Sequence, residues 1–140
     1  MRSISREATL FNPDPAAYLP HSFPFLVLDR LVALEPGVAA TALLGITSDC
    51  KGFPPILLVE AMAQLGGIAA GQREGEGGTL AAINRAELPP AVNPGDQVTV
   101  EARISKGFGH LYLVEGKAVV GGEQVAQATL TLAVGRFGEK

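Results

Sequence analysis

The chain has 140 residues and a net charge of −3, and 47% of its residues are hydrophobic while 18% are charged. This length suits a single domain with a substantial core, and the composition excludes an intrinsically disordered chain. The negative charge and the lack of any cluster of Lys and Arg exclude a nucleic-acid-binding surface.

The cysteine content and the N-terminal segment indicate the compartment. Cys50 is the only cysteine, so a disulfide framework within the chain is excluded and a reducing environment is indicated. The segment 1–18 contains no apolar run of signal-peptide length. We therefore expect a cytoplasmic protein.

The first half of the chain is predicted to form a β-hairpin followed by a helix. Residues 26–34 (LVLDRLVAL) and 38–47 (VAATALLGIT) are rich in aliphatic side chains, and Pro36 and Gly37 between them favour a turn. Both segments are therefore predicted to be strands, paired with each other.

The helix is predicted over residues 54–72 (PPILLVEAMAQLGGIAAGQ), with Pro55 at its first position. Nearly every residue from Ile56 to Ala70 is apolar or small, which predicts a helix that is covered on most sides. Glu60 and Gln64 are the exceptions and, four residues apart, share one face. Because a buried carboxylate is costly unless it is paired or open to a cavity, Glu60 is predicted either to face a site or to be paired with a cation. These polar residues, with Pro and Gly, also exclude a membrane-spanning helix.

Four more strands are predicted after a polar, glycine-rich connection at 73–78. Apolar and polar residues alternate most clearly in QVTVEARIS, and the last two strands are joined by a tight turn at Gly121–Glu123. The tail 136–140 is expected to be loose. The four strands are predicted at 79–88, 97–105, 111–120 and 124–134.

Six strands and one long helix predict an α+β fold. A helix of about 18 residues spans about 27 Å, and an antiparallel sheet of five to six strands is wide enough to wrap around it. This arrangement explains why the helix has no polar face. The sequence therefore predicts one domain organised around residues 54–72.

Several strings resemble the β-hydroxyacyl-[acyl-carrier-protein] dehydratases of fatty-acid synthesis, a family with the hot-dog fold. They are LPHSFPFLVLDRLVALEPG (19–37), LLVEAMAQLGG (57–67) and NPGDQVTVEARI (93–104), with weaker matches at 80–88 and 114–133. The most specific part is EAMAQ, which begins at Glu60. The resemblance implies a single hot-dog domain over residues 1–140.

The resemblance also implies an assembly and a ligand. It implies a homodimer or a trimer of dimers, with acyl-thioester sites at the subunit interface that are open to the pantetheine arm of an acyl carrier protein or coenzyme A. Glu60 matches the catalytic carboxylate of the family, and Gln64 matches a supporting glutamine. Asp29 and Arg30 match a pair that we interpret as structural. We expect no cofactor and no metal ion.

The sequence departs from the family in the loop before the helix. Dehydration needs a base for the α-proton and an acid for the leaving hydroxyl, and in the family a loop histidine is that base. The corresponding loop here, 48–55, is shorter and has no histidine. If Phe53 and the following proline are aligned with the Phe-Pro pair of the family loop, Gly52 occupies the position of the histidine. In the family, the N–H of a glycine at the start of the helix faces the thioester carbonyl. Pro55 occupies that position here and has no N–H, although Ile56 or Leu57 could still donate one.

The remaining candidates for the missing base are few. His21 could be a substitute acid or base, although a histidine hydrogen-bonded to backbone is the stronger interpretation. His110 is predicted to be exposed in a bend between strands. Cys50 has no visible base beside it, and Asp49 is interpreted as a turn former.

Three functions remain open from the sequence. The first is a dehydratase-like protein that binds acyl thioesters but is catalytically incomplete alone, and that could be the partner of a histidine-bearing paralogue. The second is a hot-dog thioesterase that uses Glu60 with water. The third is a non-catalytic binding subunit of a fatty-acid or polyketide pathway, in which Glu60 has no chemical role.

Overall fold

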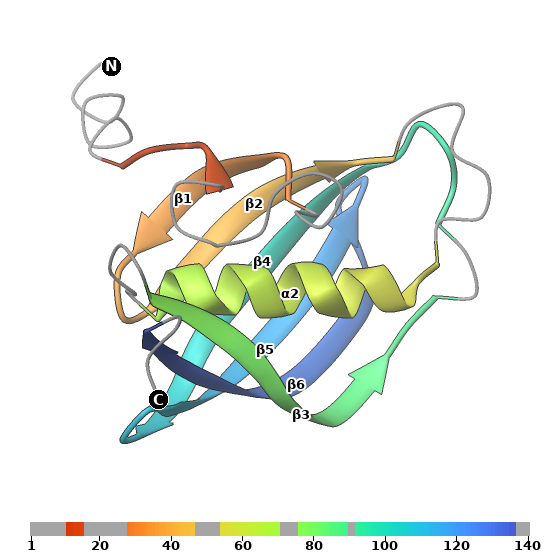
Figure 1. Ribbon diagram of the computed structural model, residues 1–140. Coiled ribbons are helices and arrows are strands. Elements are labelled where there is room, and N and C mark those ends of the chain that lie inside the picture. The colour runs from red at the N-terminus through yellow and green to blue at the C-terminus, as the bar shows by residue number, and fades with distance from the viewer. Residues whose placement is uncertain (1–10, 16–27, 47–53, 71–75, 90–91, 137–140) are drawn as a thin grey trace.

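The computed structural model describes residues 11–15, 28–46, 54–70, 76–89 and 92–136. Within these residues it contains one six-stranded antiparallel sheet that curves around one α-helix (Figure 1). The strand order is β1-β2-β4-β5-β6-β3, so the strand that follows the helix lies at the edge beside the last strand. The elements are β1 (Arg30–Glu35), β2 (Ala39–Gly45), α2 (Ile56–Ala69), β3 (Glu76–Glu87), β4 (Gln97–Phe108), β5 (Leu111–Val120) and β6 (Glu123–Arg136).

One face of the sheet holds the core because apolar residues alternate along its central strands. In β4, Val98, Val100 and Ala102 are buried, whereas Glu101 and Arg103 between and beside them are more exposed. Successive side chains of a strand point to opposite faces, so these two sets lie on the inner and outer faces of the sheet. The core therefore lies between the inner face and α2.

Helix α2 is covered on nearly all sides. Every residue from Ala61 to Ala69 is buried, and the helix contacts β2, β3, β4, β5 and β6. The expected helix without a polar face is thus explained by a sheet that surrounds it. The helix begins at Ile56, immediately after Pro55, and ends at Ala69, which is shorter than the expected 54–72.

Small residues allow the sheet and the helix to approach closely. A Cβ atom on Gly116 of β5 would lie 2.8 Å from the Cβ, Cγ and Sδ atoms of Met62. Ala102 and Ala128 flank Gly116 on the neighbouring strands, which continues the row of small residues across the sheet. Within the helix, a Cβ on Gly66 would lie 2.9 Å from Cδ1 of Leu132, as expected for a glycine that permits close packing.

Asp29 joins the start of β1 to the end of β2. Its Oδ2 accepts a hydrogen bond of 2.6 Å from the N–H of Gly45, and its own N–H donates to the carbonyl oxygen of Leu43 at 2.9 Å. Such a carboxylate fixes the register of the hairpin at its open end. The structural role that we assigned to Asp29 is consistent with this geometry.

The predicted set of six strands and one helix is confirmed, but several bounds differ. Strand β3 begins at Glu76, so the expected polar connection is wrong for residues 76–78, which pair with residues 134–136 of β6. The same pairing extends β6 to Arg136, the first residue of the expected loose tail. Strand β4 continues to Phe108. No helix among the described residues is long and apolar enough to cross a membrane.

Candidate functional site

Glu60 and Gln64 form a hydrogen-bonded pair on α2. The Nε2 atom of Gln64 donates to Oε2 of Glu60 over 2.9 Å. Gln64 is only 2% exposed and is the one polar side chain in the core of the described part of the chain, whereas Glu60 is partly exposed. The pair is therefore anchored in the interior at Gln64 and reaches the surface at Glu60.

The environment of the pair is apolar and well packed. The residues that flank Glu60 along the helix, Val59 and Ala61, are buried, and Glu60 is the only charged residue of α2. A hydrogen bond to a carboxylate is about twice as strong as one between neutral groups, so the buried amide restrains the orientation of the carboxylate. The arrangement can therefore present one carboxylate in a defined position, where it can donate or accept a proton.

The start of α2 offers one further polar group. Pro54 and Pro55 have no N–H, and their carbonyl oxygens accept the N–H groups of Leu57 and Leu58 at 2.9 Å. Leu57 is therefore not available as a donor to a ligand. At the helix start, no described residue accepts a hydrogen bond from the N–H of Ile56, and Ile56 is 52% exposed.

The structure describes only one of the remaining candidate residues, His110. His21, Gly52 and Phe53 lie outside the described residues, as do Asp49 and Cys50. His110 is exposed in the turn between β4 and β5, as expected. Figure 1 shows this turn on the side of the C-terminal end of α2, whereas Glu60 lies in the second turn from the N-terminal end. His110 is therefore not a replacement for the missing loop histidine.

No group of three or more His, Cys, Asp or Glu residues in the described ranges could hold a metal ion.

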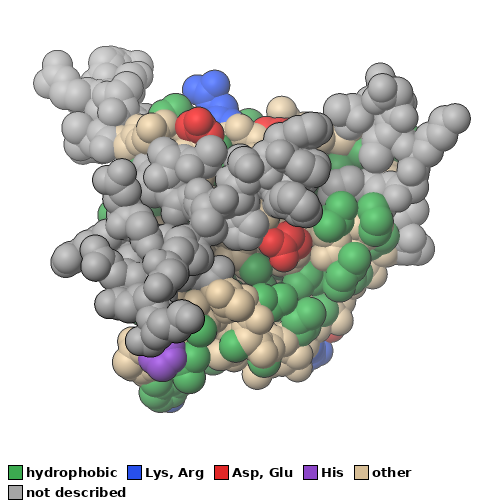
Figure 2. Space-filling view, in the orientation of Figure 1, with side chains coloured by type: hydrophobic (Ala, Val, Ile, Leu, Met, Phe, Trp, Pro, Cys, Tyr) green, Lys and Arg blue, Asp and Glu red, His purple; other side chains and the backbone are tan. Residues whose placement is uncertain are grey.

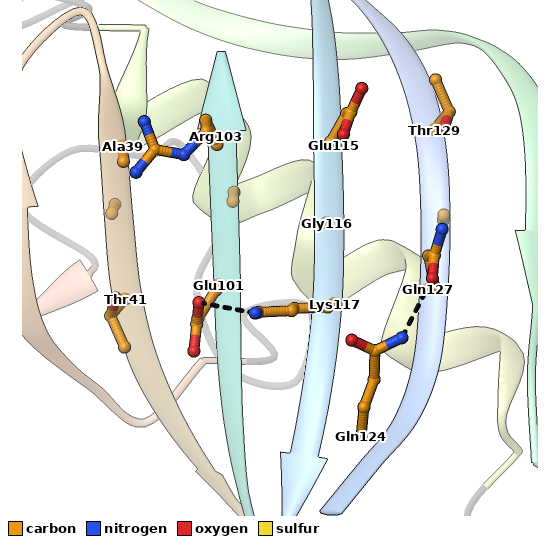
Figure 3. Close-up of a pocket in the computed structure, with 13 residues that line it drawn as sticks. Ala39, Thr41, Glu101, Arg103, Glu115, Gly116, Lys117, Gln124, Gln127 and Thr129 are labelled. Atoms are coloured by element: carbon orange, nitrogen blue, oxygen red, sulfur yellow. Dashed lines mark hydrogen bonds and ion pairs between the residues drawn. The ribbon is translucent and has the colours of Figure 1, made fainter. Parts of the chain in front are cut away.

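A hollow of about 430 Å³ lies on the outer face of the sheet, opposite α2 (Figure 3). It is lined by residues of β2, β4, β5 and β6, and Glu60 is not among them. Its long polar side chains include Glu101, Arg103, Glu115 and Lys117. The sequence analysis did not predict this hollow, although two polar positions of the alternating segment 97–105, Glu101 and Arg103, line it.

The edge strand β3 is exposed along most of its length. All residues from Ala81 to Glu87 are exposed, and Ile83 is exposed by 46%. Figure 2 shows hydrophobic side chains gathered between β3 and the N-terminal end of α2. Within the described residues this edge pairs with no strand other than β6, and an unpaired edge is a template for pairing with another strand.

Comparisons with known proteins identify similar sequences and similar folds. A family model described as the FabA-like domain matches residues 19–129. The 3-hydroxyacyl-[acyl-carrier-protein] dehydratase FabZ of Listeria monocytogenes is 36% identical over 129 residues, which cover 83% of this chain and 90% of that protein.

Two solved structures share the fold. The dehydratase heterocomplex ApeI:P from Xenorhabdus doucetiae superposes with a TM-score of 0.81 at 17% identity, covering 92% of this chain and 95% of that one. The fluoroacetyl-CoA thioesterase FlK superposes with a TM-score of 0.62 at 20% identity, covering 74% and 90%. The predicted hot-dog fold is confirmed by these superpositions.

Proposed function

Because the chain belongs to the FabA-like domain family, we propose that it is a dehydratase-like subunit that binds acyl thioesters and supplies one half of an acid–base pair. Its dehydratase relatives support the substrate class, a 3-hydroxyacyl group on an acyl carrier protein. The observation that carries the proposal is the Glu60–Gln64 pair, which retains a positioned carboxylate in a chain without the loop histidine.

Glu60 would act as the acid of the reaction. In dehydration the α C–H bond breaks, its electron pair forms the Cα=Cβ double bond, and the β C–O bond breaks as the hydroxyl leaves. Glu60 would protonate that hydroxyl, which departs as water, while a separate base takes the α-proton. Ile56 would supply the N–H that polarises the thioester carbonyl, since the two prolines before it cannot.

The missing base limits what this chain does alone. One positioned base contributes about 10²–10⁴-fold, or about 3–5 kcal/mol of the barrier. With no histidine brought to Glu60 among the described residues, we propose that a homo-oligomer is a slow dehydratase. The base would come from a histidine-bearing paralogue.

The exposed edge of β3 supports the assembly that this requires. Antiparallel pairing of β3 with the matching strand of a second subunit would satisfy its free edge and cover the apolar side chains around Ile83. The ApeI:P protein, which has a similar fold, is a dehydratase heterocomplex. A homodimer and a hetero-oligomer could both form through this edge, and the activity of the mixture with a paralogue distinguishes these two.

The test compares this chain alone with this chain mixed with a histidine-bearing FabZ paralogue. We expect little formation of the enoyl thioester from a 3-hydroxyacyl carrier protein by this chain alone. In the mixture we expect activity above that of the paralogue alone, and this gain should disappear with Glu60→Gln. A chain that dehydrates at ordinary enzyme rates by itself would disprove the proposal.

A thioesterase is the second candidate, because a carboxylate and a water suffice for hydrolysis and Glu60 is held in place by a buried amide. Thiol release from short and long acyl-CoA substrates, compared between the parent chain and Glu60→Gln, tests it. Equal and negligible rates exclude it. If acyl-thioester binding also survives Glu60→Ala, a non-catalytic binding subunit is the remaining function.

A further inference from the structure

The outer face of the sheet carries four charges in an alternating square. Glu101 and Arg103 on β4 face Lys117 and Glu115 on β5, so each charge has opposite charges beside it both along and across the strands. All four line the hollow of about 430 Å³ on the side of the sheet that faces away from α2 (Figure 3).

Only one of the two cross-strand pairs is closed within the chain. The Nζ atom of Lys117 lies 3.6 Å from Oε1 of Glu101, and both side chains remain more than 40% exposed. Within the described residues, neither Arg103 nor Glu115 takes part in an ion pair, and Figure 3 shows their side chains directed away from each other. Two opposite charges in one hollow are thus left without partners.

The charge pattern is complementary to itself. If a second copy packs face to face, related by a two-fold axis in the plane of the sheet and parallel to the strands, residues of β4 lie over residues of β5. Glu101 then faces Lys117 of the second copy, and Arg103 faces Glu115. An axis across the strands also places opposite charges together, with Glu101 over Arg103 and Glu115 over Lys117.

The shape of the sheet sets where the two copies would touch. Because the sheet curves around α2, its outer face is convex across the strands, so a face-to-face contact would be centred on the two middle strands, β4 and β5. The hollow gives room for the long side chains of the opposite copy. A second copy would also cover Leu43 and Val119. Both are half-buried and lie in the cross-strand row next to that of Glu101 and Lys117.

We propose that this outer face is an interface between two copies of the chain, stacked back to back through the Glu101, Arg103, Glu115 and Lys117 square. The occupant is a second copy rather than an unrelated partner, because self-complementarity under a two-fold axis is what an isologous interface requires. The interface is separate from the β3 edge, so it would join two such assemblies and double their mass.

Variants with reversed charges test the interface, because each substitution replaces a charged side chain with one of the opposite charge. An acidic variant, Arg103→Glu with Lys117→Glu, and a basic variant, Glu101→Lys with Glu115→Lys, should each have half the mass of the parent in sedimentation experiments at low ionic strength. A mixture of the two in equal amounts should restore the parent mass, because an acidic face then meets a basic one. Raising the salt concentration should weaken association of the parent.

A further variant separates the effect of the charge pattern from the effect of the net charge. Reversal of all four charges keeps both the net charge and the alternating square, so that variant should retain the parent mass. Circular dichroism of each variant is the check that it is folded. The proposal is wrong if the acidic variant has the parent mass over the same concentration range, or if the acidic and basic variants remain at half mass when mixed.

Discussion

The contact between Gly116 and Met62 makes a quantitative prediction about stability. Gly116→Ala introduces a Cβ that lies 2.8 Å from three atoms of Met62, well inside ordinary van der Waals separation. One of these atoms is the Cβ of Met62, which is fixed to the helix backbone and cannot rotate away. Helix or strand must therefore shift by several tenths of an ångström.

The expected cost follows from two opposing effects. Overpacking of a well-packed core costs about 1–3 kcal/mol, while replacing glycine in a strand interior regains about 0.5–1 kcal/mol. We expect Gly116→Ala to lower the free energy of unfolding by about 1–2 kcal/mol. For a chain of this size the midpoint of thermal unfolding should fall by about 3–8 °C.

Gly66→Ala is the matched control, with the same change in chemistry. Its Cβ would approach Cδ1 of Leu132, the far end of a flexible side chain, although Val114 is also near at 3.0 Å. Helix propensity gains about 1 kcal/mol from the same substitution, so the net change should be within about 1 kcal/mol of zero.

Urea denaturation of both variants, at one protein concentration, measures the difference. The fixed concentration matters because association contributes to apparent stability. We expect the Gly116 variant to be the less stable of the two. Equal stability of the two variants, or a Gly116→Ala protein as stable as the parent, would refute the argument from close packing.

Three further predictions concern single side chains. Asp29→Ala should lower the free energy of unfolding by about 1–2 kcal/mol in urea because the N–H of Gly45 loses its acceptor, and Asn, which keeps an acceptor, should cost less. Gln64→Glu should destabilise the protein more than Gln64→Met at pH 7, because two carboxylates then meet. That difference should shrink as the pH is lowered and the introduced carboxyl group takes up a proton. Ile83→Lys on the exposed edge of β3 should halve the mass of the assembly formed through that edge in light scattering, and an unchanged mass would locate the contact elsewhere.

The sequence predicted most of the fold because the spacing of apolar residues indicates which segments are strands and which is the helix. The alternation in residues 97–105 and the apolar run after Pro55 indicated a half-buried strand and a covered helix, and both are present. It did not predict that Glu76–Gly78 are strand residues, because glycines beside charged residues have the composition of a turn. Their pairing with residues 134–136 is a long-range interaction that no local pattern contains.

The candidate site was predicted in part. The spacing of Glu60 and Gln64 placed both on one face of a helix, and their hydrogen bond follows from that spacing. Because the start of a helix leaves N–H groups unpaired, the sequence also left Leu57 as a possible donor, but the carbonyl of Pro54 already accepts its N–H. The outer hollow was missed because it depends on which strands are neighbours, and each strand read alone shows only an ordinary solvated face.

The strand order sets the time at which the domain can be completed during synthesis. Strand β3 leaves the ribosome soon after the helix, yet its hydrogen-bonded neighbour is the final strand, β6. Until that last segment emerges, the helix stays uncovered along one flank and the nascent chain exposes apolar surface to the cell. A premature stop before residue 123 would therefore yield a polypeptide without a closed core, not a smaller version of the same domain.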